Sequence, residues 1–362
     1  MKTLLILILI LAGIVVLVSA CMSLPTFGTK PKGERLERMK QSPNFKDGVF
    51  VNQEPTPAMV RGEMKDSIDK LYRSFILDSM GDVSSGSRKP SGKINAVSAD
   101  LRNLPSEGDW IVWFGHSSYL FQVSGVRFLV DPVFGTASPV WFVNKPVEGS
   151  DIYKPEDLPN IDYLIITHDH YDHMDYTTCK KLREKVRHAV CPLGVDAHLE
   201  RWGYRPGQIV EMDWNKSISI NGVTIYCLPQ RHFSGRTFKR NPTLWASFMI
   251  ETDGKTIFVA GDGGYGRHFK EIEKRFPSID LAILENGQYN PQWPFIHTLP
   301  YQLRQVIDDL GVKQILTVHH GKYAEALHPW EEPERLVDYL AKDSSLTFIR
   351  PAIGELTSLK LR

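Results

Sequence analysis

The sequence predicts a layered α/β or α+β domain, and three observations carry this prediction. From Asp109 onward, short apolar segments are separated by turn residues, which is typical of strands. The first of these segments follow one another directly, whereas the later ones alternate with helical stretches. Several apolar segments also end abruptly in His or Asp, at 167–168, 261–262 and 318–319. Polar residues at strand ends meet along one edge, where layered sheets build their sites.

Nine segments are predicted as strands because they are short, apolar and bounded by turn residues. They span 110–114, 118–123, 126–131, 162–168, 223–229, 244–251, 256–262, 281–285 and 314–320. Helical stretches intervene near 176–187, 194–202, 266–275, 300–310 and 331–342. We place this globular domain at 106–362.

Residues 22–105 are predicted to be a tether and an N-terminal arm. The stretch 22–66 is rich in Pro, Gly and Lys and has no sustained apolar period. Residues 67–80 show helical spacing of Ile68, Leu71, Phe75 and Ile76, so this segment is expected to form a helix that docks on the body. Residues 81–93 are predicted to be a loop.

Residues 1–21 form a signal segment, with one cation at Lys2 and an unbroken apolar run before Cys21. "VSAC" resembles a bacterial lipobox, in which the cysteine is lipidated and becomes the mature N-terminus. We therefore expect an exported lipoprotein, with an uncleaved anchor helix or soluble secretion as alternatives. All three interpretations place the domain outside the cytoplasm. The absence of Asp after Cys21 favours the outer membrane over the cell membrane.

The composition, 42% hydrophobic and 23% charged, allows a sizeable core. A formal charge of +1 without a basic cluster argues against a nucleic-acid partner. The cysteines after Cys21 are scattered and fit neither a disulfide framework nor a zinc finger. Cys191 and Cys227 lie in apolar runs, so we expect them to be buried.

The heptapeptide "THDHYDH" at 167–173 contains three of the 12 histidines of the chain. Strand geometry would place His168 and His170 on one face, and the following turn can bring Asp172 and His173 to an adjacent point. Burying such groups together is costly unless a metal is bound. The arrangement favours two metal ions, and imidazole with carboxylate suits zinc, followed by iron or manganese.

This heptapeptide resembles the HxHxDH signature of the metallo-β-lactamase fold. The resemblance implies an α+β fold, a four-layer αββα sandwich with a dinuclear metal site at one edge. Other segments resemble one branch, the N-acylphosphatidylethanolamine phospholipase D-like hydrolases. They are "WFGHSSYLFQ", "LVDPVFGTASP", "PQRHFSGRTFKRNPTLWASF", "AGDGGY", "GQYNPQW" and "VHHGKY", with "SPNFKDGVFVN" in the N-terminal arm. The resemblance covers the chain from about residue 42 to near its C-terminus.

The resemblance implies seven metal ligands in this sequence. Those of the first metal are His168, His170 and His232. Those of the second metal are Asp172, His173 and His319, while Asp262 bridges the two. His319 is preferred to His320 because of its spacing to Gly321, and strand alternation agrees that only one of two neighbours faces the site.

The resemblance also implies three accessory residues. Asp131 resembles the carboxylate that orients a metal-bound histidine, and its alternative role is a turn before Pro132. His116 is near the site by resemblance and otherwise a turn residue. His297 aligns with a histidine near the active site of the phospholipase branch, where it would protonate a leaving group. A surface-loop histidine is the alternative.

The implied reaction is hydrolysis. Two metals that share Asp262 lower the pKa of a shared water, and the hydroxide attacks a phosphorus or an acyl carbon. No serine or cysteine nucleophile is needed, since neither "HFSG" nor "GHSS" has the glycines that flank the serine of a nucleophile elbow.

Three positions depart from the branch. Gly263 stands where Thr is usual, Glu285 and Asn286 replace a Pro-Ile pair, and His320 replaces Trp. We expect none of them to touch a metal ligand but all of them to lie near the rim of the site, so they bear on the lipid substrate and not on the metals.

We therefore expect a membrane-tethered zinc hydrolase that cleaves a phosphodiester, first of all an N-acylated phospholipid. A membrane tether favours a lipid, because it raises the effective substrate concentration. Residues 138–146 would add a membrane-facing aromatic lip, unless Trp141 and Phe142 belong to the core. A lactonase or other ester hydrolase is the second candidate. A metal-binding lipoprotein without turnover is disfavoured, because all seven ligand positions are filled.

Overall fold

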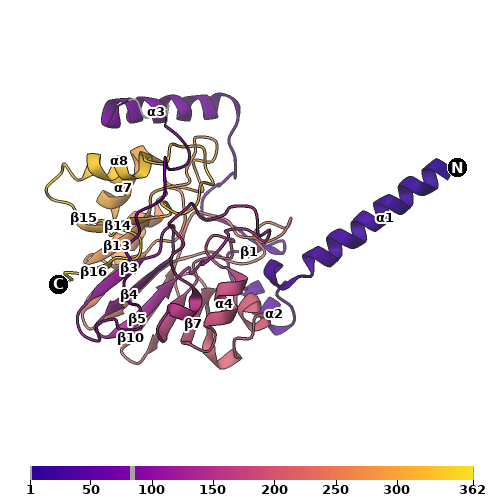
Figure 1. Cartoon of the computed structure of the whole chain (residues 1–362), viewed down its shortest axis with the longest axis horizontal. Coiled ribbons are helices and arrows are strands. Elements are labelled where there is room, and N and C mark those ends of the chain that lie inside the picture. The colour runs from indigo at the N-terminus through magenta and orange to yellow at the C-terminus, as the bar shows by residue number, and fades with distance from the viewer. Residues whose placement is uncertain (1, 82–85, 362) are drawn as a thin grey trace.

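Two seven-stranded sheets form the centre of the protein in the computed structural model, which describes residues 2–81 and 86–361 (Figure 1). The strand orders are β16-β3-β4-β5-β6-β7-β8 in the first sheet and β15-β14-β13-β12-β11-β10-β9 in the second. Each sheet is antiparallel at one end and parallel at the other: β3 to β5 are antiparallel and β5 to β8 parallel, while β9 to β12 are antiparallel and β12 to β15 parallel.

The strands are short, as the sequence predicts. Those of the first sheet are β3 (Trp110–Trp113), β4 (Tyr119–Val123), β5 (Val126–Val130), β6 (Ile161–Ile165), β7 (Val186–Pro192), β8 (Ile209–Met212) and β16 (Leu356–Ser358). Those of the second sheet are β9 (Ser217–Ile220), β10 (Val223–Leu228), β11 (Ser247–Thr252), β12 (Lys255–Val259), β13 (Leu281–Glu285), β14 (Gln314–Val318) and β15 (Thr347–Ile349).

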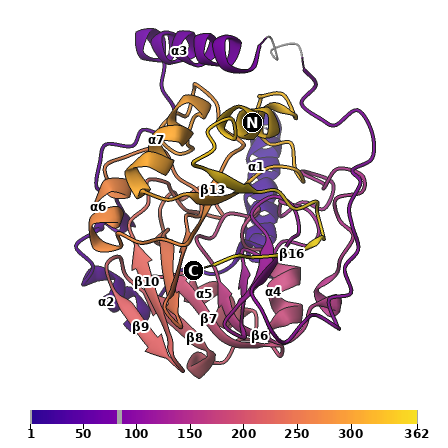
Figure 2. The same cartoon turned by 90° about the vertical axis from the view of Figure 1, so that its left-hand side faces the viewer.

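Three buried cores separate four layers. Alternate residues of a strand point to opposite faces of its sheet, so Phe121 packs in the core between the sheets whereas its neighbour Leu120 packs beneath the helices. Strands that are buried on both faces are apolar throughout, which explains their unbroken runs. Helices α4 (Tyr176–Leu182) and α5 (Asp196–Arg201) cover the first sheet. Helices α6 (His268–Arg275), α7 (Pro300–Leu310) and α8 (Glu332–Leu340) cover the second (Figure 2). The predicted four-layer αββα sandwich is confirmed.

The predicted helix at 176–187 is shorter than expected. It begins after Asp175, whose side chain accepts a hydrogen bond of 2.7 Å from the Thr178 amide, and it ends at Leu182. Strand β7 follows from Val186 and was missed, because the basic residues around it interrupt its apolar pattern. The short edge strands β8, β9, β15 and β16 were also missed.

The N-terminal region comprises α1 (Lys2–Met22), a short helical turn η1 (Pro25–Phe27), α2 (Glu34–Lys40), the β1 (Phe45–Lys46) and β2 (Val49–Phe50) hairpin, and α3 (Gly62–Met80). Two further turns of this kind, η2 (Pro155–Asp157) and η3 (Pro206–Gln208), lie within the body. Helix α1 projects away from the body (Figure 1). Across the described residues, we find no helix with both the length and the apolar character needed to cross a membrane.

The segment after α1 is fixed to the body by hydrogen bonds. Arg201 donates to the Ser23 carbonyl at 2.6 Å, and Trp202 donates to the Pro25 carbonyl at 2.8 Å. Arg35 of α2 forms an ion pair with Asp196. Although 22–66 was predicted to begin as a free tether, the chain is therefore in contact with the body within a few residues of Cys21.

Helix α3 docks on the body, as predicted. The Phe75 ring packs edge-on against Tyr301 and Tyr339, and Ile76 is buried, whereas Leu71 is 52% exposed. The loop predicted at 81–93 lies partly outside the described residues. Cys191 and Cys227 are buried and free, which confirms their predicted burial, and Cys179 is buried and free as well.

Candidate metal centre

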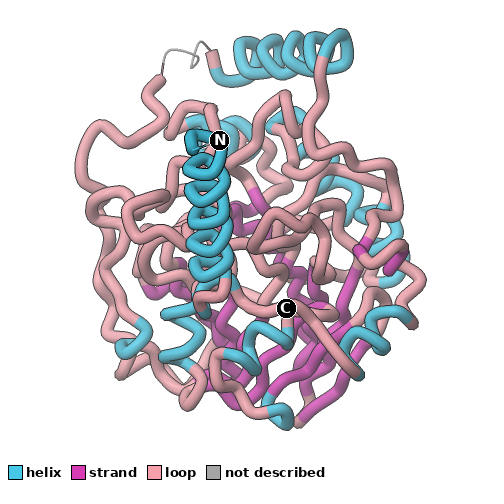
Figure 3. Tube along the Cα trace, turned by 90° about the vertical axis from the view of Figure 1, so that its right-hand side faces the viewer, coloured by secondary structure: helices cyan, strands magenta, loops and turns pink. Residues whose placement is uncertain are grey.

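The site lies in loops that follow strands of both sheets. Figure 3 shows the loops of the molecule in pink and the strands in magenta. All seven predicted ligands come together at the site. The expectation that Asp262 closes its strand was wrong, because β12 already ends at Val259. His232 likewise lies beyond the end of β10 at Leu228. The loops continue beyond the sheet, and only His319 directly follows its strand.

Three histidines form one side of the centre, which we call the imidazole flank: His168, His170 and His232. The Nδ1 atom of His170 lies 2.9 Å from His168 Nε2 and 3.3 Å from His232 Nε2. Nitrogen ligands at about 2.0–2.1 Å from a tetrahedral zinc are roughly 3.3 Å apart, so this spacing fits a common cation. The Ile296 carbonyl, 2.7 Å from Nδ1 of His232, holds that ring in place.

The opposite side, which we call the mixed flank, combines a carboxylate with imidazoles. It contains the predicted ligands Asp172, His173 and His319 together with His116. Asp172 Oδ2 is 3.3 Å from His173 Nε2 and 2.9 Å from His116 Nε2. His116 therefore lies within the site, and with φ of 54° it is also the turn residue that the alternative interpretation describes.

Asp262 joins the two flanks. Its Oδ2 atom is 3.0 Å from His173 Nε2 and 4.0 Å from His168 Nε2, and its Oδ1 atom is 3.2 Å from His319 Nδ1. The preceding Gly261 has φ of 63°, and a Cβ there would lie 2.9 Å from the Cβ of Thr167. Glycine is favoured at this position because φ is positive and the backbone lies directly against the side chain of Thr167.

Asp131 orients the mixed flank. Its Oδ2 atom is 2.8 Å from Nδ1 of His173 and accepts a hydrogen bond of 2.6 Å from the Thr167 hydroxyl, while its Oδ1 atom accepts one of 2.8 Å from the Thr167 amide. A carboxylate in this position fixes the tautomer and the orientation of a ligating imidazole. Asp131 also has φ of 40°, which is typical of a turn. The two alternative roles that the sequence suggested for Asp131, a turn residue and an orienting carboxylate, therefore occur together.

The electrostatics differ between the flanks. Burial lowers the pKa of His168, His170 and His232, so these imidazoles stay neutral with free lone pairs. Burial also opposes protonation of His173, but the carboxylates of Asp262, Asp172 and Asp131 outweigh it and raise the pKa of that imidazole. Metal binding requires neutral imidazole, so the imidazole flank is the better prepared of the two.

Unpaired polar atoms indicate that these residues can hold metal ions. Within the described part of the chain, the buried atoms His173 Nε2 and Asp262 Oδ1 have no hydrogen-bond partner. Buried polar groups are normally satisfied, and unpaired ones call for a ligand such as an ion. Five histidines and two aspartates around these atoms are a suitable donor set for zinc, iron or manganese.

His297, the predicted proton donor, lies beside the centre. Its ring is 5.2 Å from the rings of His232 and His319, so it faces both flanks. Its Nδ1 is 2.9 Å from Glu285 Oε2. Burial raises the pKa of Glu285 to about 7, and Glu285 raises the pKa of His297 although burial opposes this. The surface-loop alternative for His297 does not hold, because the ring is largely enclosed.

Glu285 is a site residue that sequence reasoning missed. It was expected to lie on the rim without touching a ligand, but its carboxylate belongs to a cluster with Asp262, His297 and His319. The one signal in the sequence was an acidic residue at the end of an apolar strand where the branch has no acid. At Gly263, another departure, the Gln230 side chain occupies the space that a Cβ would need. His320 points away from the centre, toward Trp113 and Glu334.

Glu325 is a second residue that the sequence did not indicate. Its carboxyl interacts with that of Asp172, and burial together with Asp172 raises the pKa of Glu325. Asn144 donates to Glu325 Oε1 at 3.0 Å. The mixed flank thus continues through Glu325 into the loop that contains Asn144.

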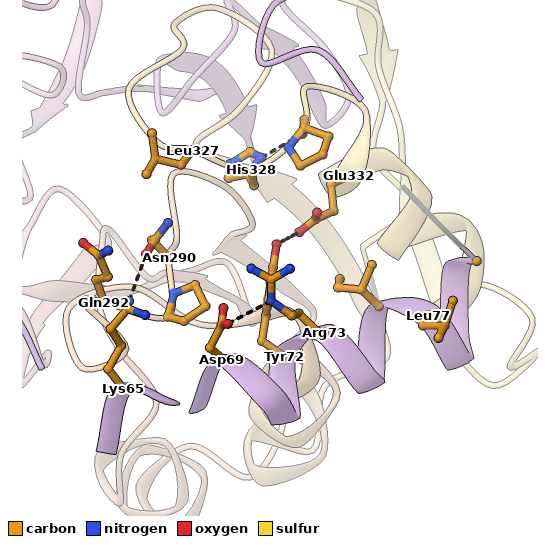
Figure 4. Close-up of a pocket in the computed structure, with 14 residues that line it drawn as sticks. Lys65, Asp69, Tyr72, Arg73, Leu77, Asn290, Gln292, Leu327, His328 and Glu332 are labelled. Carbon is orange, nitrogen blue, oxygen red and sulfur yellow. Dashed lines mark hydrogen bonds and ion pairs between the residues drawn. The ribbon is translucent and has the colours of Figure 1, made fainter. Parts of the chain in front are cut away.

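A cavity of about 540 Å³ beneath α3 is separate from the centre (Figure 4). The Tyr72 hydroxyl crosses it to donate to Glu332 Oε1 at 2.6 Å, and none of the seven predicted ligands is among the described residues that line it.

Comparison with known proteins agrees with this geometry. The family described as "Beta-lactamase superfamily domain" matches residues 126–320. An uncharacterized protein of Mycobacterium tuberculosis (strain ATCC 25618 / H37Rv) is 35% identical over 321 residues, which cover 87% of this chain and 84% of the relative. N-acyl-phosphatidylethanolamine-hydrolyzing phospholipase D 1 of Caenorhabditis elegans is 28% identical over 284 residues, 73% of this chain and 79% of the relative.

Among solved structures, the fold is similar to that of Igni18, a metallo hydrolase from the archaeon Ignicoccus hospitalis. The TM-score is 0.55 at 18% identity, with 70% of this chain and 99% of Igni18 covered. At this identity the similarity shows the fold alone. Together with the residues matched by the family model, it means that the chain belongs to the β-lactamase superfamily, as a metal-dependent hydrolase of the metallo-β-lactamase fold.

Proposed function

We propose that the protein is an exported, membrane-tethered hydrolase with two zinc ions, which cleaves a phosphodiester of the N-acylphosphatidylethanolamine type. The observation that carries this proposal is the pair of flanks joined by Asp262, with His297 in contact with both. The relative from Caenorhabditis elegans, whose name describes cleavage of such lipids, supports the substrate class.

The ligands are assigned by flank. His168, His170 and His232 would hold one ion, Asp172, His173 and His319 the other, and Asp262 both. When bound, the ions would act as Lewis acids and lower the pKa of a bound water to about 7, so that hydroxide forms near neutral pH. Asp131 keeps His173 oriented through the contact at its Nδ1, and the Ile296 carbonyl does the same for His232.

His297 is the proton donor in this proposal. Its Nδ1 faces Glu285, which leaves Nε2 available for the leaving oxygen of a substrate. Glu285 acts as a positioning residue, because it fixes the ring and favours its protonated form.

The N-terminus supports the membrane tether. The large apolar side chains of α1 that are described are exposed, from 41% at Val18 to 68% at Val16. Cys21 is exposed at the end of α1, where lipidation requires it to be accessible.

The test combines metal analysis with a substrate panel. Full-length protein in detergent would be analysed for metal content and offered bis(p-nitrophenyl) phosphate, N-acylphosphatidylethanolamine, a homoserine lactone and nitrocefin. We expect two zinc equivalents and turnover of both phosphodiesters, reduced roughly a thousandfold in Asp262→Asn. The control, Asp253→Asn, changes an aspartate in the exposed turn between β11 and β12. Turnover of the lactone alone would replace the substrate assignment, and full activity in Asp262→Asn would remove the metal mechanism.

A further inference from the structure

Two loops at the site carry exposed aromatic side chains, and we call them the rim loops. In the loop 138–145, Trp141 is 73% and Phe142 61% exposed, and in the loop 236–240, Phe238 is 89% exposed. The core alternative for Trp141 and Phe142 is therefore wrong. Large aromatic side chains in water are unfavourable unless a partner covers them, so their exposure marks an interaction surface.

Both rim loops lead directly to the metal centre. Asn144 of the first contacts Glu325, whose carboxyl interacts with Asp172 of the mixed flank. The second follows Phe233, whose ring is 4.3 Å from that of His170 in the imidazole flank. The Arg240 guanidinium lies 4.1 Å over the same Phe233 ring. The loops that carry the exposed aromatics are thus connected to the metal centre from both of its flanks.

Positive charge accompanies the aromatics. Lys145 lies 4.9 Å over the Trp141 ring. A cavity of about 560 Å³ next to Phe142 is lined by Lys89, Lys93 and Lys145, with Glu148 as the one acid among the described lining residues. The second loop, "RTFKR", has no acid. Aromatic and cationic side chains in combination are typical of surfaces that bind anionic lipid headgroups.

The chain also enters the body beside the second rim loop. Arg236 donates to the Thr26 carbonyl at 2.7 Å, and Met22, Thr237 and Lys239 line one cavity. A stretch from residue 21 to 26 spans at most about 18 Å when fully extended. A membrane attachment at Cys21 or α1 therefore holds this loop close to the bilayer.

We propose that the rim loops seat the entrance of the site on an anionic phospholipid surface, as a second membrane contact besides the N-terminal segment. The three aromatics insert at the level of the headgroups, and Lys89, Lys93 and Lys145 bind lipid phosphates. This contact is independent of the hydrolysis proposed above. It would let a lipid pass from the bilayer to the metal centre without crossing water.

The test places a polarity-sensitive dye on the full-length chain in the Cys21→Ser background. Phe142→Cys and Phe238→Cys report on the rim loops, and Leu77→Cys on α3 is the matched control, because Leu77 is 61% exposed on a different surface. The remaining cysteines are buried and do not compete for the dye. The proteins are added to vesicles of phosphatidylcholine with or without phosphatidylglycerol, which contain a lipid-borne quencher.

We expect strong quenching at positions 142 and 238 and little at 77. Reversal of one lysine, as in Lys145→Glu, should weaken the quenching on phosphatidylglycerol vesicles by about fivefold at low salt. If the chain is bound to the vesicles but quenching is equally weak at all three positions, the proposal is overturned. The N-terminal tether would then be the membrane contact. A failure of the chain to associate with vesicles would overturn both. A dye shift that depends on protein concentration without lipid would identify a second copy of the chain as the partner instead.

Discussion

The two flanks of Asp262 share one carboxylate but differ in chemistry. The imidazole flank presents His168, His170 and His232, whose pKa values burial lowers. The mixed flank surrounds His173 with three carboxylates, which raise its pKa and favour a proton at the place where a metal is expected. The difference teaches that the imidazole flank can bind a cation without losing a proton, whereas His173 of the mixed flank must release a proton before it can bind one. We expect the imidazole flank to fill first.

The largest effect is expected when one flank loses a ligand. His232→Gln should abolish tight binding of the first metal and lower turnover roughly a thousandfold, because both ions are needed. His319→Gln should lower turnover comparably but retain one equivalent of metal on the imidazole flank. Metal analysis after dialysis distinguishes the two, and His188→Gln, which changes a histidine outside the cluster, is the control. Two equivalents retained in both variants would contradict the assignment.

A smaller effect is expected from the residues that face both flanks. His297→Gln should lower kcat about a hundredfold by removing the proton donor, with the metal content unchanged. Glu285→Gln keeps the ring but loses its carboxylate partner, so we expect a loss of about tenfold in kcat and little change in KM. Glu251→Gln, which changes a strand carboxylate bonded to Tyr226, is the matched control. A loss of metal in His297→Gln would make His297 a ligand instead.

Asp131→Asn sharpens the comparison within one flank. It should weaken metal binding on the mixed flank by about 10- to 100-fold, because His173 loses the acceptor at its Nδ1. The imidazole flank, which Asp131 contacts only through Thr167, should keep its affinity. Competition with a chelator measures the two binding steps separately. An equal loss in both steps would show that Asp131 supports the whole loop and not one ligand.

His268 provides a reference for a buried imidazole outside both flanks. Burial lowers its pKa to about 3, below the ordinary value of 6.5. As the pH falls, this imidazole is protonated in the unfolded chain before it is protonated in the folded protein. The protein therefore loses free energy of unfolding between pH 6.5 and about 3. In His268→Gln the free energy of unfolding should fall less steeply with decreasing pH than in the unchanged protein. The two slopes should differ by up to about 1.4 kcal/mol per pH unit. Urea unfolding at several pH values measures the slopes, and parallel curves for both proteins would refute this.

The sequence was sufficient for the features that depend on local pattern. The apolar runs identified the central strands, and the density of "THDHYDH" identified the centre, because these signals lie within a few neighbouring residues. Strand β9 escaped prediction because only four residues, "SISI", carry its alternating pattern. Glu285 and Glu325 were not predicted as site residues, because the fold brings them close to ligands that are far away in the sequence. The spacing of neighbouring residues does not indicate such contacts.

The contact at Gly261 has a consequence for the tolerance of the protein to substitution. The backbone at Gly261, in the loop that carries Asp262, rests directly on the side chain of Thr167, so this contact sets the spacing between the two loops. Substitutions that repack either helical layer are separated from this contact by the sheets. The hydrophobic layers can therefore diverge in sequence while the spacing of the two loops that carry the predicted ligands is kept.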